Sequence, residues 1–416
     1  MQQTQKEAQQ QLQPQNLYLS PNQKAFKRLK RNKPAVVGFV ILCFAVFIAV
    51  FAYFLAPDPT TNANDQVPQM PTQPVGFKAK LLKLTKDRTI ASTNFFTRLL
   101  WGIDSPYELV PLTGWHFEGD SLLIDKFTTA ATKDTTKSAY HIADVVYALA
   151  TNPDITKQND ALSFTLLSGE RITKTIGELQ KNIETKHIIS KTYLLGTDKA
   201  GRDNLSRLIL GVRVSLSVGI MSVLISLIIG VVLGAVAGYF RGKTDDAIMW
   251  FINVFWSVPL LLMVFALVMV MGRHFWQIYL AVGLTMWVEV ARLVRGQFLS
   301  LREKEYVEAA KSLGFSHGRI IFKHILPNAI GPIVVVTAAN FASAIIIEAG
   351  LSFLGIGVEL PTPSWGSMLN EYYGYVGTSK AFLALIPGTA ICVLVLAFYL
   401  IGNGLSDALN VKVKTE

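Results

Sequence analysis

The chain has 416 residues, a net charge of +10, and a hydrophobic fraction of 51%. A soluble nucleic-acid-binding protein could carry such a charge. However, the apolar residues concentrate in charge-free runs that are long enough to cross a bilayer, which excludes an ordinary soluble protein. The basic excess lies beside these runs, so nucleic acid is not an expected partner.

The first apolar run covers residues 35–55 and follows a Gln-rich segment and a basic stretch. The Gln-rich segment has little to bury and is expected to be disordered. The run is too long for the apolar part of a signal peptide, and no small-residue cleavage site ends it. We predict a cytoplasmic tail over residues 1–33, disordered and then basic, and an uncleaved transmembrane helix over 34–57.

Five further apolar runs predict a polytopic all-α membrane protein with six transmembrane helices. The fourth run of the six is short and contains Glu289. Without it, however, the most basic loop, 292–328, would lie outside, against the positive-inside rule. Both termini are then cytoplasmic, with a short tail at 411–416. The five runs are 214–240, 247–272, 275–291, 329–347 and 381–401.

The segment 58–194 is predicted to be an extracytoplasmic insert with mixed α and β structure. Residues 58–76 are rich in Pro, Asn and Gln and indicate a linker. A hairpin is expected at 163–175 and a helix at 176–183. The histidines of the insert show no metal-ligand spacing. The aromatic side chains proposed for its core are Trp101, Trp115, Phe117 and Tyr140.

Glycines recur every four residues on one face of the second predicted helix, at Gly230, Gly234 and Gly238. A ridge without side chains lets another helix approach closely in lipid. The ridge is interpreted either as the packing seam of a translocation bundle or as ordinary packing within the chain. The sequence alone does not separate the two.

A phosphate-binding loop is not present at Gly242-Lys243-Thr244, although its last residues fit the pattern. The pattern requires another glycine five residues before the first of these, where Ala237 stands. If transport is driven by ATP, a separate chain must hydrolyse it.

The loop 292–328 is too polar to cross a membrane and has the pattern of a helix-turn-helix. Gly314 suits the left-handed residue that ends the first helix, and Ser316 suits the cap of the second. Pro327 is expected to stop the second helix before the next span. A basic amphipathic segment lying on the membrane surface is the alternative. The two predicted helices are 303–313 and 317–325.

This loop resembles the EAA motif of ABC importer permeases through Glu308-Ala309-Ala310, Gly314 and Leu326-Pro327. The resemblance implies a coupling helix that docks into a groove of an ATPase subunit. Glu308 would anchor the helix through a nearby Arg or Lys, and the two alanines would leave room for docking. The residues to which we assign ATPase coupling are Glu308, Ala309, Ala310, Gly314, Ser316, Arg319, Leu326 and Pro327.

Other motifs resemble the dipeptide, oligopeptide and nickel branch of this family, in its second (C-type) permease subunit. They are Leu195-Gly196-Thr197-Asp198, Gly201-Arg202-Asp203, Leu351-Ser352-Phe353-Leu354-Gly355 and Pro363-Ser364-Trp365-Gly366. The resemblance covers about 195–410 and the first helix. It implies the type I permease fold, with a core of five membrane helices over 195–410.

The resemblance also implies function and partners. The chain would pair with a second permease in the bacterial inner membrane and import di- or oligopeptides by alternating access. Two ATP-binding subunits would bind ATP and Mg²⁺, and an extracytoplasmic binding protein would deliver the solute. This chain would not be an enzyme and would hold no cofactor or metal. The residues that bind substrate are not identified.

Three alternatives stay open. Nickel chelates or another small solute could replace the peptide. A channel or ion-coupled transporter would need ionisable groups within its spans, where only Glu289 and Glu348 are candidates; both are expected to snorkel or pair near span ends. The insert either contacts the binding protein or is an inert insertion.

Overall fold

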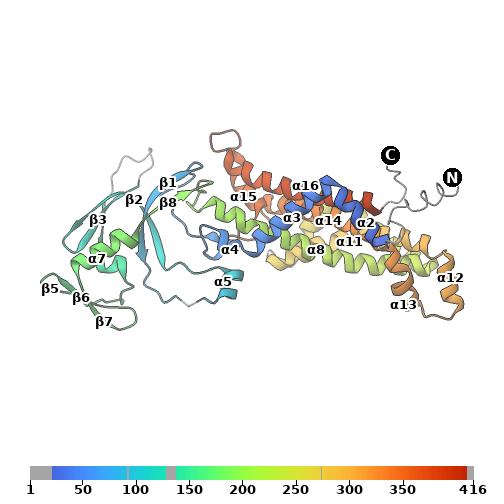
Figure 1. The fold of residues 1–416 in the computed structure, drawn as a ribbon, viewed down its shortest axis with the longest axis horizontal. Coiled ribbons are helices and arrows are strands. Elements are labelled where there is room, and N and C mark those ends of the chain that lie inside the picture. The colour runs from blue at the N-terminus through green and yellow to red at the C-terminus, as the bar shows by residue number, and fades with distance from the viewer. Residues whose placement is uncertain (1–20, 91–92, 128–136, 273, 410–416) are drawn as a thin grey trace, which may run out of the picture.

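The computed structural model describes residues 21–90, 93–127, 137–272 and 274–409. The molecule is elongated, with the strands of the insert at one end, the long helices in the middle, and α12 and α13 at the other end (Figure 1). The residues 1–20 and 411–416, predicted as tails, lie outside the described ranges.

Five helices of the described ranges are long and apolar enough to cross a membrane. Two further helices, α9 and α10, meet at an angle of 87° and make a sixth crossing if they form one span. The five are α3 (Lys33–Val50), α8 (Asn204–Phe240), α11 (Phe275–Leu301), α14 (Leu326–Phe353) and α16 (Phe382–Leu409).

The third predicted span, 247–272, is broken rather than continuous. It consists of α9 (Gly242–Trp256) and α10 (Leu260–Met271). Pro259 stands at the break with extended ψ. Proline provides no N–H to a helix and drives the residue before it out of helical conformation, which accounts for the bend at this point.

The first membrane helix packs against the last one. Asn32 caps α3 by accepting a hydrogen bond from Ala35 N at 3.1 Å, and its Nδ2 donates to Asp407 at 3.3 Å. A Cβ added to Gly404 would come within 2.3 Å of the Ala35 Cβ. The basic stretch before Asn32 forms its own helix, α2 (Pro21–Arg31), which the sequence analysis did not predict.

The glycine ridge of α8 lies against α11 of the same chain. A Cβ added to Gly230 would approach Val290 Cβ to 2.5 Å, and one added to Gly234 would approach Ala291 O to 2.5 Å. At Gly238 the added Cβ would lie 2.6 Å from Phe298 Cβ. The ridge therefore allows two membrane helices of one subunit to pack closely.

The insert contains two antiparallel sheets. The larger has the strand order β4-β3-β2-β1-β8 and the smaller β5-β6-β7. The predicted hairpin is β6 and β7, paired from Ala161–Thr175 to Thr165–Arg171, and the predicted helix is α7 (Ile176–Asn182). The strands are β1 (Phe77–Thr85), β2 (Tyr107–Glu118), β3 (Ser121–Lys126), β4 (Lys137–His141), β5 (Thr156–Gln158), β6 (Ala161–Thr165), β7 (Arg171–Thr175) and β8 (Ile188–Tyr193).

Three of the four aromatic residues proposed for the core of the insert do pack against it. These are Trp115, Phe117 and Tyr140, which contact the cluster around Leu122. The prediction for Trp101 is wrong, because its side chain is 67% exposed at the end of a separate short helix.

The segment 58–76 is not a linker, because it packs against the start of α8. Asp58 N donates to Ser206 Oγ at 2.8 Å, and Thr72 N donates to Asp198 O at 2.8 Å. Val67 is completely buried. Pro68 and Pro71 lie in turns, which proline favours.

The motif before α8 forms a buried ionic cluster at the insert side of the helices. Arg207 is fully buried and pairs with Asp198 and with Glu371 of α15 (Trp365–Tyr372). Arg202 also contacts Asp198, through a 2.6 Å hydrogen bond from Nε. The cluster ties the entry of α8 to α15.

Candidate coupling site and transport pathway

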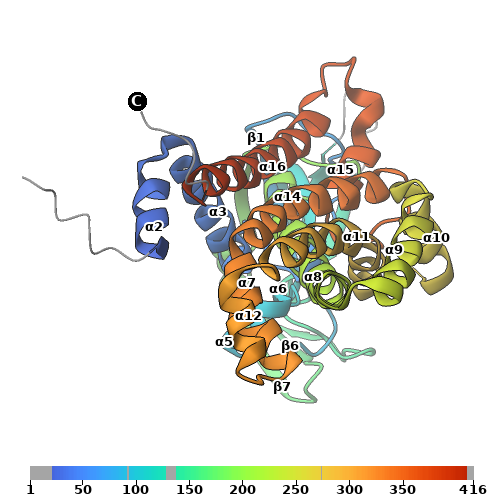
Figure 2. The ribbon, with the colours of Figure 1, turned by 90° about the vertical axis from the view of Figure 1, so that its right-hand side faces the viewer.

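The coupling hairpin, defined here as residues 302–328, lies at the end of the molecule opposite the insert (Figures 1 and 2). Its first helix is α12 (Glu305–Ser312), and its second is α13 (His317–Arg319), which continues as a wider helical turn, Ile320–Ile325. The predicted loop began at residue 292, but α11 extends through Leu301. The first ten residues of the predicted loop therefore continue the helix α11.

Pro327 was predicted to stop the second helix, but this prediction is wrong. Pro327 lies in the first turn of α14. The chain stays helical from His317 to Phe353. Pro327 follows directly after the wider turn Ile320–Ile325, and the helix continues through it. The consequence is a direct helical connection from the hairpin into a membrane span.

Gly314 ends α12 in the left-handed conformation that the sequence predicts, with φ of +75°. Its N–H donates to Lys311 O at 2.9 Å, and Phe315 N donates to Ala310 O at 3.1 Å. Such hydrogen bonds satisfy carbonyl groups at the helix end that would otherwise lack a donor. Ser316 stands at the cap of α13, but its side chain makes no capping hydrogen bond.

One face of the coupling hairpin is buried against the membrane helices. Val307, Ala310 and Ile325 join an apolar cluster with Phe298 of α11. Ala310 is only 3% exposed, so its side chain packs within this chain and is not presented to a partner. Of the two alanines, Ala309 alone lies on the outer face.

The opposite face is exposed and partly apolar. Leu313 is 72% exposed and Phe322 66% exposed, while the guanidinium of Arg319 lies 4.0 Å from the centre of the Phe315 ring. Glu308 is exposed and forms no ion pair with any described residue, so its predicted anchoring contact is absent. Leu326 is half-buried and Pro327 exposed at the start of α14.

The hairpin is held to the end of α8 by residues that the sequence analysis missed. Tyr239 Oη and His317 Nδ1 lie 2.9 Å apart, and Arg302 donates to Tyr239 O. Arg241 Nη2 contacts Glu303 Oε1 at 2.6 Å, and this hydrogen bond lowers the pKa of Glu303. The only sequence signal was the position of these residues beside the two span ends.

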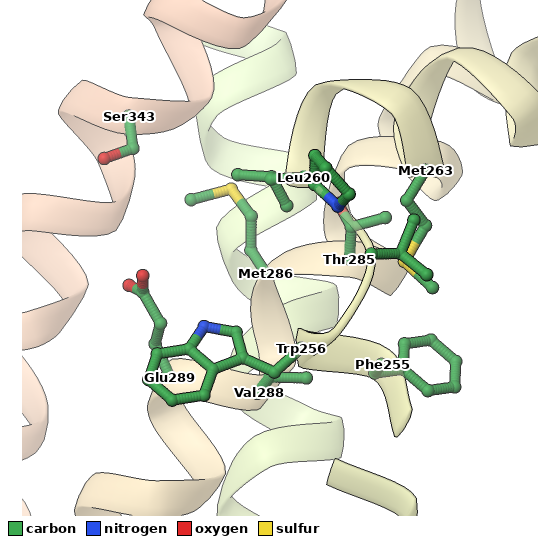
Figure 3. Close-up of a pocket in the computed structure, with 11 residues that line it drawn as sticks. Phe255, Trp256, Leu260, Met263, Thr285, Met286, Val288, Glu289 and Ser343 are labelled. Atoms are coloured by element: carbon green, nitrogen blue, oxygen red, sulfur yellow. The ribbon is translucent and has the colours of Figure 1, made fainter. Parts of the chain in front are cut away.

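A pocket of about 260 Å³ opens where the break between α9 and α10 meets α11 and α14 (Figure 3). Its walls are mostly apolar, with Trp256 and Met286 near the Glu289 carboxylate. Ser343 of α14 faces the pocket from the other side. Glu289 is exposed in this single chain and has no ion-pair partner among the described residues.

Glu348 was expected to lie near a span end, where it would snorkel or pair. Instead its side chain is completely buried within α14. Its Oε1 accepts a hydrogen bond from Ser352 Oγ at 2.8 Å. It therefore neither snorkels nor pairs at an interface. No three His, Cys, Asp or Glu side chains gather as metal ligands within the described ranges.

Comparison with known proteins decides the family. The family described as "Binding-protein-dependent transport system inner membrane component" matches residues 230–415. A second, "N-terminal TM domain of oligopeptide transport permease C", matches residues 20–74. The oligopeptide transport system permease protein OppC of Bacillus subtilis (strain 168) is 39% identical over 225 residues, which cover 54% of this chain and 73% of that protein. The chain belongs to the ABC transporter permeases.

Further relatives place it within the family. The glutathione transport system permease protein GsiD of Pectobacterium atrosepticum is 42% identical over 226 residues, covering 54% of this chain and 75% of that protein. The dipeptide transport system permease protein DppC of Bacillus subtilis (strain 168) is 40% identical over 225 residues, covering 54% and 70%. A solved structure of the MetNI methionine ABC transporter matches 50% of this chain and 97% of that chain, at 20% identity and a TM-score of 0.42.

These matches confirm the sequence-based prediction of a C-type permease of the oligopeptide and dipeptide branch. The protein is a multi-pass membrane protein with the type I importer permease fold and a β-sheet insert, and ATP is hydrolysed by separate subunits. The two family matches leave out residues 75–229, which include most of the insert.

Proposed function

We propose that this permease imports di- and oligopeptides across the bacterial inner membrane by alternating access. As a permease of an ABC importer for peptides or glutathione, it needs a contact through which an ATPase can move its helices. The observation that carries the proposal is the coupling hairpin, whose second helix runs without interruption into α14. Closure of the two ATPases would move α14 as a rigid body.

The proposed orientation places the coupling hairpin and both chain termini in the cytoplasm. The hairpin is basic, and positive charges favour the cytoplasmic side. The insert, at the other end of the molecule, then lies outside, where an extracytoplasmic binding protein would deliver the solute.

The solute path is proposed to pass the pocket beside Glu289, on a face shared with a second, similar permease. A carboxylate within a membrane span is costly unless it faces protein or water. Glu289 is exposed and without an ion-pair partner in the described part of this chain. We infer that its face lines an aqueous pathway or meets the second permease.

Glutathione is the second candidate, because the GsiD relative is 42% identical to this chain. The test is uptake into vesicles that contain the complete transporter with its own binding protein. A labelled dipeptide and a labelled pentapeptide are each supplied with ATP, and unlabelled glutathione is added as competitor. Peptide uptake that glutathione does not reduce supports the proposal. Uptake of glutathione in place of either peptide would contradict it.

A further inference from the structure

A short apolar helix of the insert, α5 (Phe95–Trp101), has no buried residue. Phe95 is 59% exposed, Phe96 73%, Leu100 52% and Trp101 67%. Large apolar side chains that gather on a surface mark an interaction site. The helix does not belong to the core of either sheet, so its apolar surface needs another explanation.

The position of α5 is fixed beside the insert-side end of the first membrane helix (Figure 1). The Phe95 and Phe54 ring centres are 5.3 Å apart, and the Arg98 guanidinium lies 4.8 Å from the Phe54 ring centre. Thr61 Oγ1 donates to Trp101 O at 2.9 Å. These contacts hold α5 against α4 (Ala52–Leu55), the last turn of that helix.

The length of the first membrane helix gives the level of this position relative to the bilayer. The 18 residues of α3 rise about 27 Å at ~1.5 Å each, which is close to the thickness of the hydrocarbon core. If Lys33 marks the inner edge, α4 reaches the outer edge. Phe54 and Leu55 of α4 are 37% and 44% exposed, so the lipid-facing surface of the first helix continues into α5.

A groove beside α5 extends this apolar surface. It has a volume of about 520 Å³, and its lining includes Leu100 and Trp101 of α5 and Leu210 of α8. Arg213 closes it, with its guanidinium 5.1 Å from the Tyr53 ring centre and Nη1 donating to Leu100 O at 3.1 Å. Apolar walls with a cation at the rim suit a phospholipid rather than a polar protein surface.

We propose that α5 is a membrane-interface anchor, whose Phe95, Phe96, Leu100 and Trp101 side chains enter the outer leaflet and hold the insert at the bilayer surface. Tryptophan and other amphipathic aromatics are favoured at the headgroup level. The partner is therefore the lipid that surrounds the first helix, and its surface continues the one that α3 already presents.

The test places the complete permease in phosphatidylcholine vesicles whose acyl chains are brominated, because bromine quenches nearby tryptophan. The emission of Trp101 is taken as the difference between the wild type and Trp101→Phe, which keeps an apolar ring. Trp115→Phe is the matched control, since Trp115 packs on the sheet of the insert. We expect brominated lipid to remove most of the Trp101 emission and little of the Trp115 emission.

The opposite result would overturn the anchor. If aqueous iodide quenches Trp101 in intact vesicles and brominated lipid does not, α5 faces water. If iodide quenches it until the binding protein is added, the surface is a protein-docking site and the lipid proposal is wrong. A Trp101 component that neither reagent quenches would show that another part of the complex covers it, which also contradicts the proposal.

Discussion

At the scale of single residues, the backbone conformation of Gly314 is the most specific feature of the coupling hairpin. Its φ of +75° lies in the left-handed region, and an added Cβ would meet no atom within 4 Å. A side chain at this position is therefore opposed only by backbone strain, of about 1–2 kcal/mol. A substitution should deform the turn without disturbing the core.

We predict that Gly314→Val uncouples ATP hydrolysis from uptake. The strained turn would change the angle between α12 and α13, so ATPase closure would no longer move α14. Uptake should fall several-fold while ATP hydrolysis persists, both measured on the same vesicles. Gly318→Val is the matched control, because Gly318 is also open but has no positive φ. Normal uptake in Gly314→Val would refute the prediction.

Asp65, in the segment 58–76 that packs against the start of α8, gives a pH-dependent prediction. Burial, together with the charge of Asp58, raises the pKa of Asp65 to about 6. The folded protein thus binds this proton more tightly than the unfolded chain does. The stabilisation that the bound proton provides is therefore lost as the pH rises from about 4 to about 6. Above that range the charged carboxylate destabilises the fold.

Asp65→Asn should therefore raise the midpoint of thermal unfolding at pH 7.5 and leave it nearly unchanged at pH 4.5. The measurement is the unfolding of the purified permease in detergent at both pH values. Asp104→Asn is the control, because the Asp104 side chain is 67% exposed. A variant that is equally or less stable than the wild type at pH 7.5 would contradict the argument.

At the scale of elements, the close contact between α8 and α11 depends on the glycine ridge. A Cβ at Gly234 would lie 2.5 Å from Ala291 O and 2.8 Å from Val294 Cβ. These neighbours belong to a helix backbone and a branched side chain, so the helices must separate to admit it. Overpacking of this kind costs about 1–3 kcal/mol.

We expect Gly234→Ala to lower the thermal unfolding midpoint and to reduce uptake in proportion to the loss of folded protein. Gly296→Ala, on the exposed side of α11, should be neutral or stabilising, because nothing lies within 4 Å of its added Cβ and alanine favours the helix by about 1 kcal/mol. Equal unfolding midpoints for the two variants would show that the ridge does not set the helix spacing.

The sequence predicted these elements unevenly, for physical reasons. Apolar runs located the spans well, because length and charge decide membrane insertion. They could not show the bend at Pro259, since a broken helix remains apolar. Pro327 was misread because proline ends one helix and begins another equally well, and local sequence does not say which. The burial of Ala310 was not predicted because it depends on packing against α11 and α14.

At the scale of the whole molecule, long-range contacts were the part that the sequence could not supply. Residues 58–76 look like a linker by composition, but their partners stand near Asp198 and Ser206, more than a hundred residues later. Trp101 was predicted as a core residue because an aromatic side chain in a sequence does not show whether it is buried within its own domain. The contacts of Glu303 and His317 with the end of α8 were missed because their partners, Arg241 and Tyr239, lie more than sixty residues earlier in the chain.

The central claim is that the coupling hairpin lies in the cytoplasm and is bound there by an ATPase subunit. The most direct test is accessibility of a single cysteine at Leu313, with Cys43 and Cys392 replaced because both are exposed. Ser168→Cys, in the exposed turn between β6 and β7, is the control on the other side. We predict that an impermeant thiol reagent labels residue 168 from outside intact cells and residue 313 only after lysis, and that the ATPase protects residue 313. Labelling of residue 313 from outside would contradict both the topology and the coupling mechanism.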